Sequence, residues 1–326
     1  MKSYWIRTEG NRTRLEPRDV PEPTASPGQI IVRVRAAGLN RGEMIVGGVM
    51  HAAEKIGGTE AAGEIHAVGD GVVNWRVGDR VMGRVIGRDR GGFAEYTLMQ
   101  AHQAMPLPGH FSWAEGAAIP VSFCAAYDAV VAYGRLREGQ WAVVTAASSA
   151  VGVAAVQTAK ILGAKVIGTS GSTTKLEALA RLGMDHGIAT RSPDFAAQVM
   201  EWTGSGANLA VNCLGGSVFA ECLRGLGFAG RLATVGYVDG IHHADIDLQK
   251  LHANRHVVFG ISNSRLGEAG HAASAAGFVR DILPAFADNR MRPHIDRIFS
   301  FDQLPDAKAH LESNTQIGKI VVSLDQ

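Results

Sequence analysis

The stretch VVTAASSAVGVAAV, at residues 143–156, decides the fold of this chain. An apolar, β-branched run typical of a buried strand passes into a turn of very small residues, and a helical pattern begins directly after the turn. A pyrophosphate binds where the backbone N–H groups of a helix N-terminus can be approached without bulky side chains in the way. We therefore expect Ser148, Ser149, Ala150 and Val151 to contact the phosphates of a dinucleotide.

This turn lacks the standard three-glycine fingerprint of dinucleotide sites. A second interpretation therefore stays open, in which the small residues serve only to pack the helix closely on its sheet. The strand–turn–helix context favours the nucleotide site.

Strands and helices alternate on both sides of this turn. Two helical patterns, at 149–164 and 173–183, separate apolar segments with strand character, and further such segments follow. The expected strands are WAVVTAA (141–147), AKVIGTS (164–170), HGIAT (186–190), LAVNCLG (209–215), RLATVGY (231–237) and HVVFGIS (256–262). Alternation of this kind predicts parallel pairing, so residues 118–260 are expected to form an α/β domain with a doubly wound parallel sheet of the Rossmann type.

The two ends of the chain have a different pattern. Residues 1–117 contain short β-branched segments such as IIVRVRAAGLN (30–40), which predict a β-rich domain. Residues 261–326 contain helical patterns near 271–290 and 305–313, and they end on the strand IGKIVVSL (317–324). If this strand pairs with the first domain, the nucleotide-binding domain is an insertion within the β-rich one.

The segment GTSGSTTK (168–175) predicts the cofactor preference. An NAD site usually has an Asp or Glu at the end of the second strand, where it binds the ribose hydroxyls. No acid is present here, and Ser170, Ser172 and Lys175 offer hydrogen-bond donors and a positive charge. Arg191 follows the next expected strand and adds a second charge. These groups suit a 2′-phosphate, so we expect NADP(H) rather than NAD(H).

Composition excludes several classes of protein. The formal net charge of the 326 residues is +1, which does not predict a nucleic-acid surface. We expect no signal peptide, since Arg7 and Glu9 interrupt the N-terminus, and no membrane helix, since no run of about eighteen apolar residues occurs. Three cysteines do not form a disulfide framework and fit a reducing cytoplasm. The pair His242–His243 has no metal-ligand spacing.

Several further segments together resemble the medium-chain dehydrogenase/reductase superfamily, and within it the zinc-free quinone oxidoreductase (zeta-crystallin-like) branch. These landmarks extend over nearly the whole chain: AAGLNRGEM (36–44), GGTEAAGEIHAVGDGV (57–72), VGDRVMG (77–83), GGFAEY (91–96), IPVSFCAAYDAV (119–130), LGGSVFAECLRGLGFAGRLATVGY (214–237) and NTQIGKIVV (314–322). The resemblance implies that the β-rich domain, 1–117 plus 261–326, is a GroES-like catalytic domain and that 118–260 binds the cofactor.

The zinc-dependent relatives in this superfamily hold a catalytic metal, and this chain departs from them. Their three ligand positions match Asn40, Thr59 and Val121, none of which is a normal zinc ligand. The four-cysteine structural lobe is missing as well. The expectation is therefore a protein without metal, in which Glu60 is a buried structural carboxylate; a catalytic role for Glu60 stays open as the lesser alternative.

A site without zinc lacks the several kcal/mol by which a Lewis acid stabilises a developing alkoxide. One hydrogen-bond donor supplies about 3 kcal/mol at most. We therefore expect hydride transfer from NADPH to an acceptor that delocalises charge itself, a quinone or an α,β-unsaturated carbonyl. Asn40 is the candidate residue that holds the acceptor oxygen. Two alternatives stay open: a zinc-free carbonyl or alcohol dehydrogenase, and an NADPH-binding redox sensor without turnover.

The resemblance also implies the remaining cofactor contacts and the assembly. The residues in question lie at strand ends and beside the IGK element: Gly236, Tyr237, Phe259, Ser262, Asn314 and Lys319. Relatives are often dimers joined at the edge strand of the nucleotide domain, so a homodimer through residues 256–262 is expected. Apart from a small-molecule substrate, neither nucleic acid nor membrane is expected as a partner.

Overall fold

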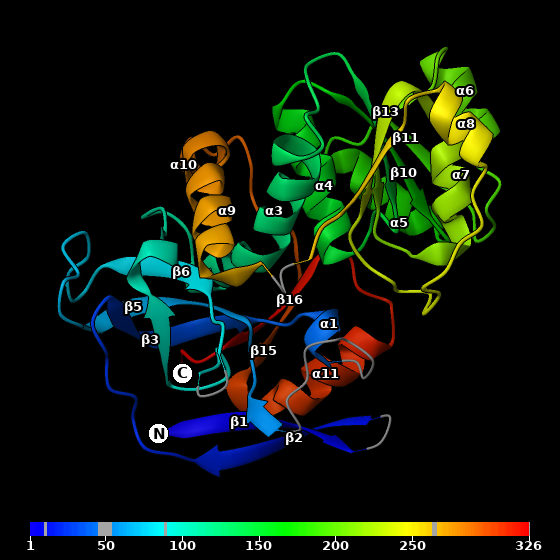
Figure 1. Ribbon diagram of the computed structural model, residues 1–326. Helices are drawn as coiled ribbons and strands as arrows, with labels where there is room; N and C mark the ends of the chain where they lie inside the picture. The colour runs from blue at the N-terminus through cyan, green and yellow to red at the C-terminus, as the bar shows by residue number, and fades with distance from the viewer. Residues whose placement is uncertain (10–11, 45–53, 88–89, 263–265, 326) are drawn as a thin grey trace. The chain divides into compact units, whose positions relative to one another are not determined.

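The structure is a computed structural model that describes residues 1–9, 12–44, 54–87, 90–262 and 266–325. Within these residues the chain divides into two compact units (Figure 1). Unit 1 comprises residues 1–121, 266–279 and 292–326, and unit 2 comprises residues 122–265 and 280–291. None of the described helices has the length and apolar character needed to cross a membrane.

Unit 2 contains a six-stranded parallel sheet with the strand order β11-β10-β9-β12-β13-β14. The strands are β9 (Trp141–Thr145), β10 (Lys165–Ser170), β11 (His186–Ala189), β12 (Ala207–Asn212), β13 (Leu226–Thr234) and β14 (Val257–Gly260). The chain moves outward from β9 to β11 and then returns to the other side of β9 at β12. This is the doubly wound order of a Rossmann sheet, and it confirms the predicted fold class.

Helices cover both faces of this sheet (Figure 1). They are α4 (Ala150–Ile161), α5 (Thr173–Arg181), α6 (Ala196–Thr203) and α7 (Phe219–Arg224). A further helix of this unit, α8 (Leu248–Ala253), has no buried residue. Helix α4 lies on one face, where most of its alanines and valines are buried against β9 and β10. Helices α6 and α7 lie on the other, packed on strand residues such as Val143, Ile167 and Leu232.

Unit 1 contains two β-sheets. The larger has the order β15-β16-β3-β5-β6-β8, with β7 also pairing with β3, and the smaller has the order β2-β1-β4. The strands of the larger sheet are β3 (Gln29–Gly38), β5 (Glu60–Val68), β6 (Arg80–Arg84), β7 (Tyr96–Gln100), β8 (Met105–Pro106), β15 (Ile295–Ser300) and β16 (Lys319–Ser323). Those of the smaller are β1 (Lys2–Glu9), β2 (Arg12–Asp19) and β4 (Glu54–Ile56).

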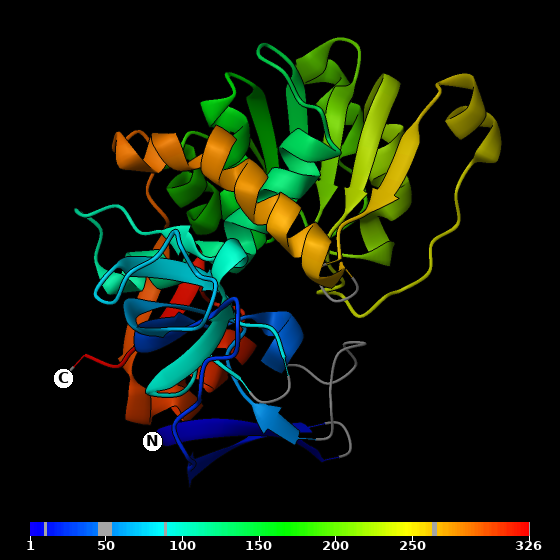
Figure 2. The same ribbon diagram turned by 60° about the vertical axis from the view of Figure 1, so that its left-hand side comes forward.

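The C-terminal strand of the chain belongs to the larger sheet. β16 pairs antiparallel with β3, with Val321 opposite Gly38. The last strand therefore returns to the N-terminal unit, as the insertion hypothesis requires. Unit 1 also holds the helices α1 (Arg41–Met44), α2 (Trp113–Ala117) and α11 (Leu304–Glu312), and most of α9 (Gly267–Asp281). Its core combines residues of β3, β5, β16 and α11. Figure 2 shows the ribbon of the chain from a second side.

The division differs from the expected one mainly at residues 280–291, which we expect in the GroES-like domain and which lie in unit 2. The expected boundaries also shift by a few residues, because 118–121 lie in unit 1 and 261–262 in unit 2. This segment includes α10 (Leu283–Ala287), where Ile282 and Phe286 are completely buried. The ring of Phe286 packs edge-on against Phe123, with 5.0 Å between the centroids. An apolar helix pattern predicts burial but does not say which of two cores the helix will join.

Candidate cofactor site and candidate active site

The two strands at the centre of the unit 2 sheet end on a buried polar network. Thr145 is the last residue of β9 and Asn212 the last of β12, and both are completely buried. The Thr145 hydroxyl donates to Asn212 Oδ1 at 2.9 Å and accepts from the backbone N–H groups of Cys213 and Leu214. Parallel sheets of this type bind ligands where the strand order reverses, between two such ends. The network holds the chain in place at that point.

The turn after β9 approaches helix α4 very closely. Ala146 has a φ of +46°, a left-handed conformation that is uncommon for alanine. A Cβ atom added to Gly152 would lie 2.6 Å from the carbonyl oxygen of Ala146, so only glycine fits there. Gly152 therefore performs the helix–strand packing role of the third fingerprint glycine, although the other two are absent.

The predicted phosphate-binding residues lie together at the start of α4. Ser148, Ser149, Ala150 and Val151 are each partly exposed, whereas the neighbouring Ala147 is buried. Ser149 is the N-cap of the helix, and its hydroxyl accepts from the N–H of Gly152 at 3.1 Å. This N-terminus has the size and polarity that suit a pyrophosphate.

The turn after β10 carries the groups expected to select the cofactor. The hydroxyl of Ser170, the last residue of β10, accepts from the N–H of Ser172, which is the N-cap of α5. Lys175 is in the first turn of that helix. The Arg191 side chain packs against Gly171. A Cβ atom added to Gly171 would lie 2.9 Å from Arg191 Nε. The structure thus brings Ser170, Lys175 and Arg191 around one turn.

The other cofactor contacts expected in unit 2 lie after strand ends. Gly236 and Tyr237 follow β13, and Tyr237 is 53% exposed, with its ring edge-on to His242. Phe259 is in β14, with the Arg231 guanidinium over its ring, and Ser262 follows that strand.

Asn40 lies where three strands of unit 1 meet. It follows β3, whose C-terminal end pairs with β5 and β16. Both neighbours are antiparallel to β3, so their first residues, Glu60 and Lys319, lie beside its end. A Cβ atom on Gly38 would be 2.6 Å from Glu60 Oε1 and 2.7 Å from Lys319 Cε, so glycine leaves the room that these side chains fill.

A continuous set of hydrogen bonds joins these residues, which we call the Asn40 cluster: Asn40, Thr59, Glu60 and Lys319. The Lys319 ammonium donates to Asn40 Oδ1 at 2.7 Å and forms an ion pair with Glu60. The Asn40 amide donates to Glu60 Oε1 at 2.7 Å and to Thr59 Oγ1 at 3.0 Å. Glu60 Oε2 accepts from the N–H of Val121 at 2.7 Å.

The charges around Asn40 determine the orientation of its amide. The side chains of Lys319 and Glu60 are only 3% and 0% exposed. A reversed amide would direct its NH₂ group at an ammonium and its oxygen at a carboxylate, and both contacts would be repulsive. In the favourable orientation both amide hydrogens are engaged, one by Glu60 and the other by Thr59.

Two residues expected in the cofactor pocket belong to unit 1. Lys319 bonds to Asn40 and Glu60, and Asn314 accepts a hydrogen bond from Arg41. No sequence pattern predicts that Lys319 contacts Asn40, since 279 positions separate them. The sequence also did not single out Thr59 as a polar group of the site, or Thr145 and Asn212. The signal for Thr59 was its place in GTEAAG, beside the buried carboxylate.

The described residues contain no group of three His, Cys, Asp or Glu side chains that could hold a metal ion. The three positions that match the zinc ligands of relatives do come together: Asn40 bonds Thr59, and the Val121 N–H bonds the neighbouring Glu60.

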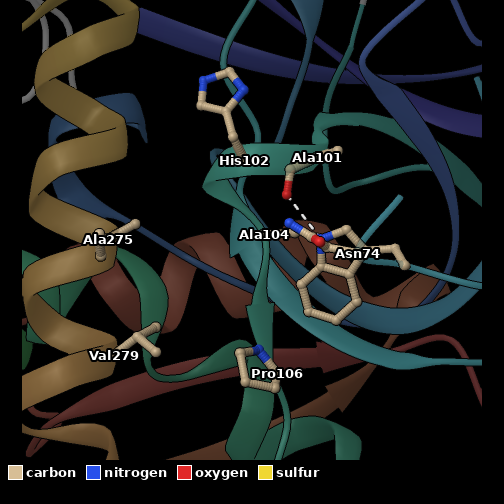
Figure 3. Close-up of a pocket in the computed structure, with 9 residues that line it drawn as sticks. Asn74, Ala101, His102, Ala104, Pro106, Ala275 and Val279 are labelled. Carbon is tan, nitrogen blue, oxygen red and sulfur yellow. Dashed lines mark hydrogen bonds between the residues drawn. The ribbon is translucent and has the colours of Figure 1, made fainter. Parts of the chain in front are cut away.

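A separate cavity of about 260 Å³ lies in unit 1 between η1 (Ala101–Gln103) and α9, and Figure 3 shows its lining. Most of the lining is apolar, and the Trp75 indole N–H donates to the carbonyl of Ala101 at 2.8 Å. At its rim His102 pairs with Glu268. None of the Asn40 cluster residues lines this cavity.

Two protein-family models match the chain, "Alcohol dehydrogenase GroES-like domain" over residues 26–109 and "Zinc-binding dehydrogenase" over residues 150–274. The human synaptic vesicle membrane protein VAT-1 homolog is 26% identical over 96% of this chain and 83% of its own length. A phenolphthiocerol/phthiocerol polyketide synthase of Mycobacterium tuberculosis is 31% identical over 98% of this chain, which spans only 15% of that protein.

Among solved structures, one described as an NAD-dependent alcohol dehydrogenase is similar to this chain. It is 26% identical, covers 99% of this chain and all of its own length, and superimposes with a TM-score of 0.88.

Proposed function

Because this chain belongs to the medium-chain dehydrogenase/reductase superfamily, in its quinone-oxidoreductase-like branch, we propose that it transfers a hydride from NADPH to a quinone or an α,β-unsaturated carbonyl without a metal. Members of this superfamily are oxidoreductases that bind a nicotinamide cofactor. The acceptor, the preference for NADPH and the independence from zinc are the proposal.

The observation that carries this proposal is the composition of the Asn40 cluster. The residues at the three zinc-ligand positions are an amide, a hydroxyl and an aliphatic side chain, and the Lys319 ammonium already bonds Asn40 Oδ1. The positive charge of the Lys319 ammonium would repel a metal ion bound at the Asn40 cluster. The cluster therefore offers a neutral hydrogen-bond donor to an acceptor oxygen and does not fit a metal.

The residues of unit 2 fit a bound dinucleotide. The start of α4 would hold the pyrophosphate, while Ser170, Lys175 and Arg191 would hold a 2′-phosphate. Gly236, Tyr237, Phe259 and Ser262 are proposed to line the nicotinamide end of the pocket. When bound, NADPH supplies a hydride to the electrophilic carbon of the acceptor.

The Asn40 cluster would stabilise the negative charge that develops on the acceptor oxygen. In a quinone or an enone that charge is shared with a conjugated system, so one neutral donor is sufficient; in a simple ketone it stays on one oxygen and needs more. Water supplies the proton afterwards. Glu60 does not serve as a base, because it is buried and both of its oxygens already accept hydrogen bonds.

Steady-state oxidation of NADPH and NADH tests the proposal, with a benzoquinone, a conjugated enone and a simple ketone as acceptors, each with and without a zinc chelator. We expect turnover of the quinone or the enone that prefers NADPH and is insensitive to the chelator. Ketone turnover that the chelator abolishes would overturn the proposal. Tight NADPH binding without any turnover would replace it with the redox-sensor alternative.

A homodimer is also proposed, through the edge strand β14. Within the described residues β14 pairs only with β13, and its Val257 and Val258 are 38% and 41% exposed. Exposed apolar residues on an unpaired strand edge favour pairing with a second copy. Val258→Lys should convert the dimer to a monomer in sedimentation velocity, and an unchanged assembly would refute this interface.

A further inference from the structure

The hydrogen bonds of the Asn40 cluster form a chain with one direction. Lys319 has only donors, so its bond to Asn40 must run from the ammonium to Oδ1. The opposite end of the same amide then carries the donors, and one of them reaches Thr59 Oγ1. The direction runs from the buried lysine, through the asparagine, to the threonine hydroxyl.

The Thr59 hydroxyl is the open end of this chain. It accepts from Asn40, and no acceptor for its own hydrogen lies among the described residues. Thr59 is also partly exposed, whereas Glu60 and Lys319 are buried. A hydroxyl that accepts one hydrogen bond becomes a stronger donor in the next, since successive bonds polarise one another.

We infer that the Thr59 hydroxyl, rather than the Asn40 amide, donates the hydrogen bond to the acceptor oxygen, and that Asn40, Glu60 and Lys319 position it. This inference rests on the proposed function and names the atom that acts in it. Asn40 has no hydrogen left for a substrate, because its two are engaged by Thr59 and Glu60. Thr59 is the catalytic residue, and the other three are positioning residues.

The hydrogen-bond chain of the Asn40 cluster also favours reduction over oxidation. Its open end is a donor, which suits a carbonyl or quinone oxygen that gains negative charge as the hydride arrives. Oxidation of an alcohol needs a group that removes the hydroxyl proton, and the carboxylate nearest Thr59 is buried and fully engaged. We therefore expect reduction of conjugated acceptors and no measurable alcohol oxidation by this site.

Three variants test the assignment in the full-length protein. Thr59→Val removes the hydroxyl and keeps the shape, Thr59→Ser keeps the hydroxyl, and Asn40→Asp replaces the amide donor with an acceptor. The matched control is Thr97→Val in the same unit, because the buried Thr97 hydroxyl has no hydrogen-bond partner among the described residues. The readouts are the single-turnover rate of NADPH oxidation by a quinone or an enone, the NADPH dissociation constant and the melting temperature.

Thr59→Val and Asn40→Asp should each slow the single-turnover step by roughly 10²- to 10³-fold, the usual loss for one oxyanion donor. Thr59→Ser should recover most of the rate, Thr97→Val should match the parent protein, and NADPH affinity should change little in Thr59→Val. A strong loss in Asn40→Asp with a normal rate in Thr59→Val would show that the amide itself contacts the acceptor and would overturn the inference. If the parent protein turns over no acceptor, the proposed function itself fails, which is a separate outcome.

Discussion

Replacement of Arg191 by alanine should weaken NADPH binding and leave NADH binding unchanged. The guanidinium lies on Gly171, next to the Ser170 and Ser172 hydroxyls, where dinucleotide sites of this fold bind the adenosine ribose. The turn contains no acidic residue that would favour a free 2′-hydroxyl. On the proposed function, Arg191 would distinguish the two cofactors through the 2′-phosphate that only NADPH carries.

The magnitude follows from a charge-assisted hydrogen bond. Such a bond contributes about 1.5–3 kcal/mol, and each 1.4 kcal/mol is tenfold in affinity, so the upper limit is roughly a 100-fold loss. Arg191 is solvent-exposed, so screening moves the expectation to the lower end, about tenfold. The loss should shrink further at high salt, because ions screen an exposed pair.

Dissociation constants for NADPH and NADH, measured by quenching of protein fluorescence at low and high ionic strength, give the comparison. Arg181→Ala is the matched control, since it removes an equally exposed arginine in the last turn of α5. NADPH affinity should fall about tenfold in Arg191→Ala only. An equal loss for both cofactors, or no loss at all, would refute the 2′-phosphate role.

Three further predictions concern chemistry and stability. Burial raises the pKa of Cys213 to about 12, and a hydrogen bond with Ser149 partly offsets this rise. Iodoacetamide should therefore not label Cys213 in the native protein at pH 8, and rapid native labelling would contradict this. The stability that the neutral thiol contributes is present below pH 9 and is lost as the pH rises toward 12. Thr145→Val removes the acceptor of the buried Cys213 N–H, while the Leu214 N–H keeps Asn212 Oδ1 as its acceptor, and it should lower the free energy of unfolding in urea by about 1–3 kcal/mol; an unchanged midpoint would mean that the Cys213 N–H finds another acceptor. Gly38→Ala places a methyl group 2.6 Å from Glu60 Oε1 and should lower both the melting temperature and the turnover rate; normal values for both would show that the cluster can rearrange.

The sequence was sufficient for the parallel sheet and for the turn between β9 and α4, for a local reason. The strand, the small residues and the helix of residues 143–156 are contiguous, and alternation of apolar segments follows directly from the periodicity of strands and helices. Ser149 and Gly152 therefore have the cap and packing roles that such a turn requires. The return of the C-terminal strand to β3 was predicted from the strength of its β pattern.

Only the tertiary structure decided the rest, because it depends on contacts between distant segments. Residues 280–291 join unit 2 through the contact of Phe286 with Phe123, which no periodicity encodes. Asn40 and Lys319 are 279 positions apart, and they meet because β3 lies between the strands that begin at Glu60 and Lys319. The family resemblance, together with its residue type, identified Asn40 as a candidate donor. The direction of its hydrogen bonds became known only when the fold placed an ammonium on one side of its amide and a carboxylate on the other.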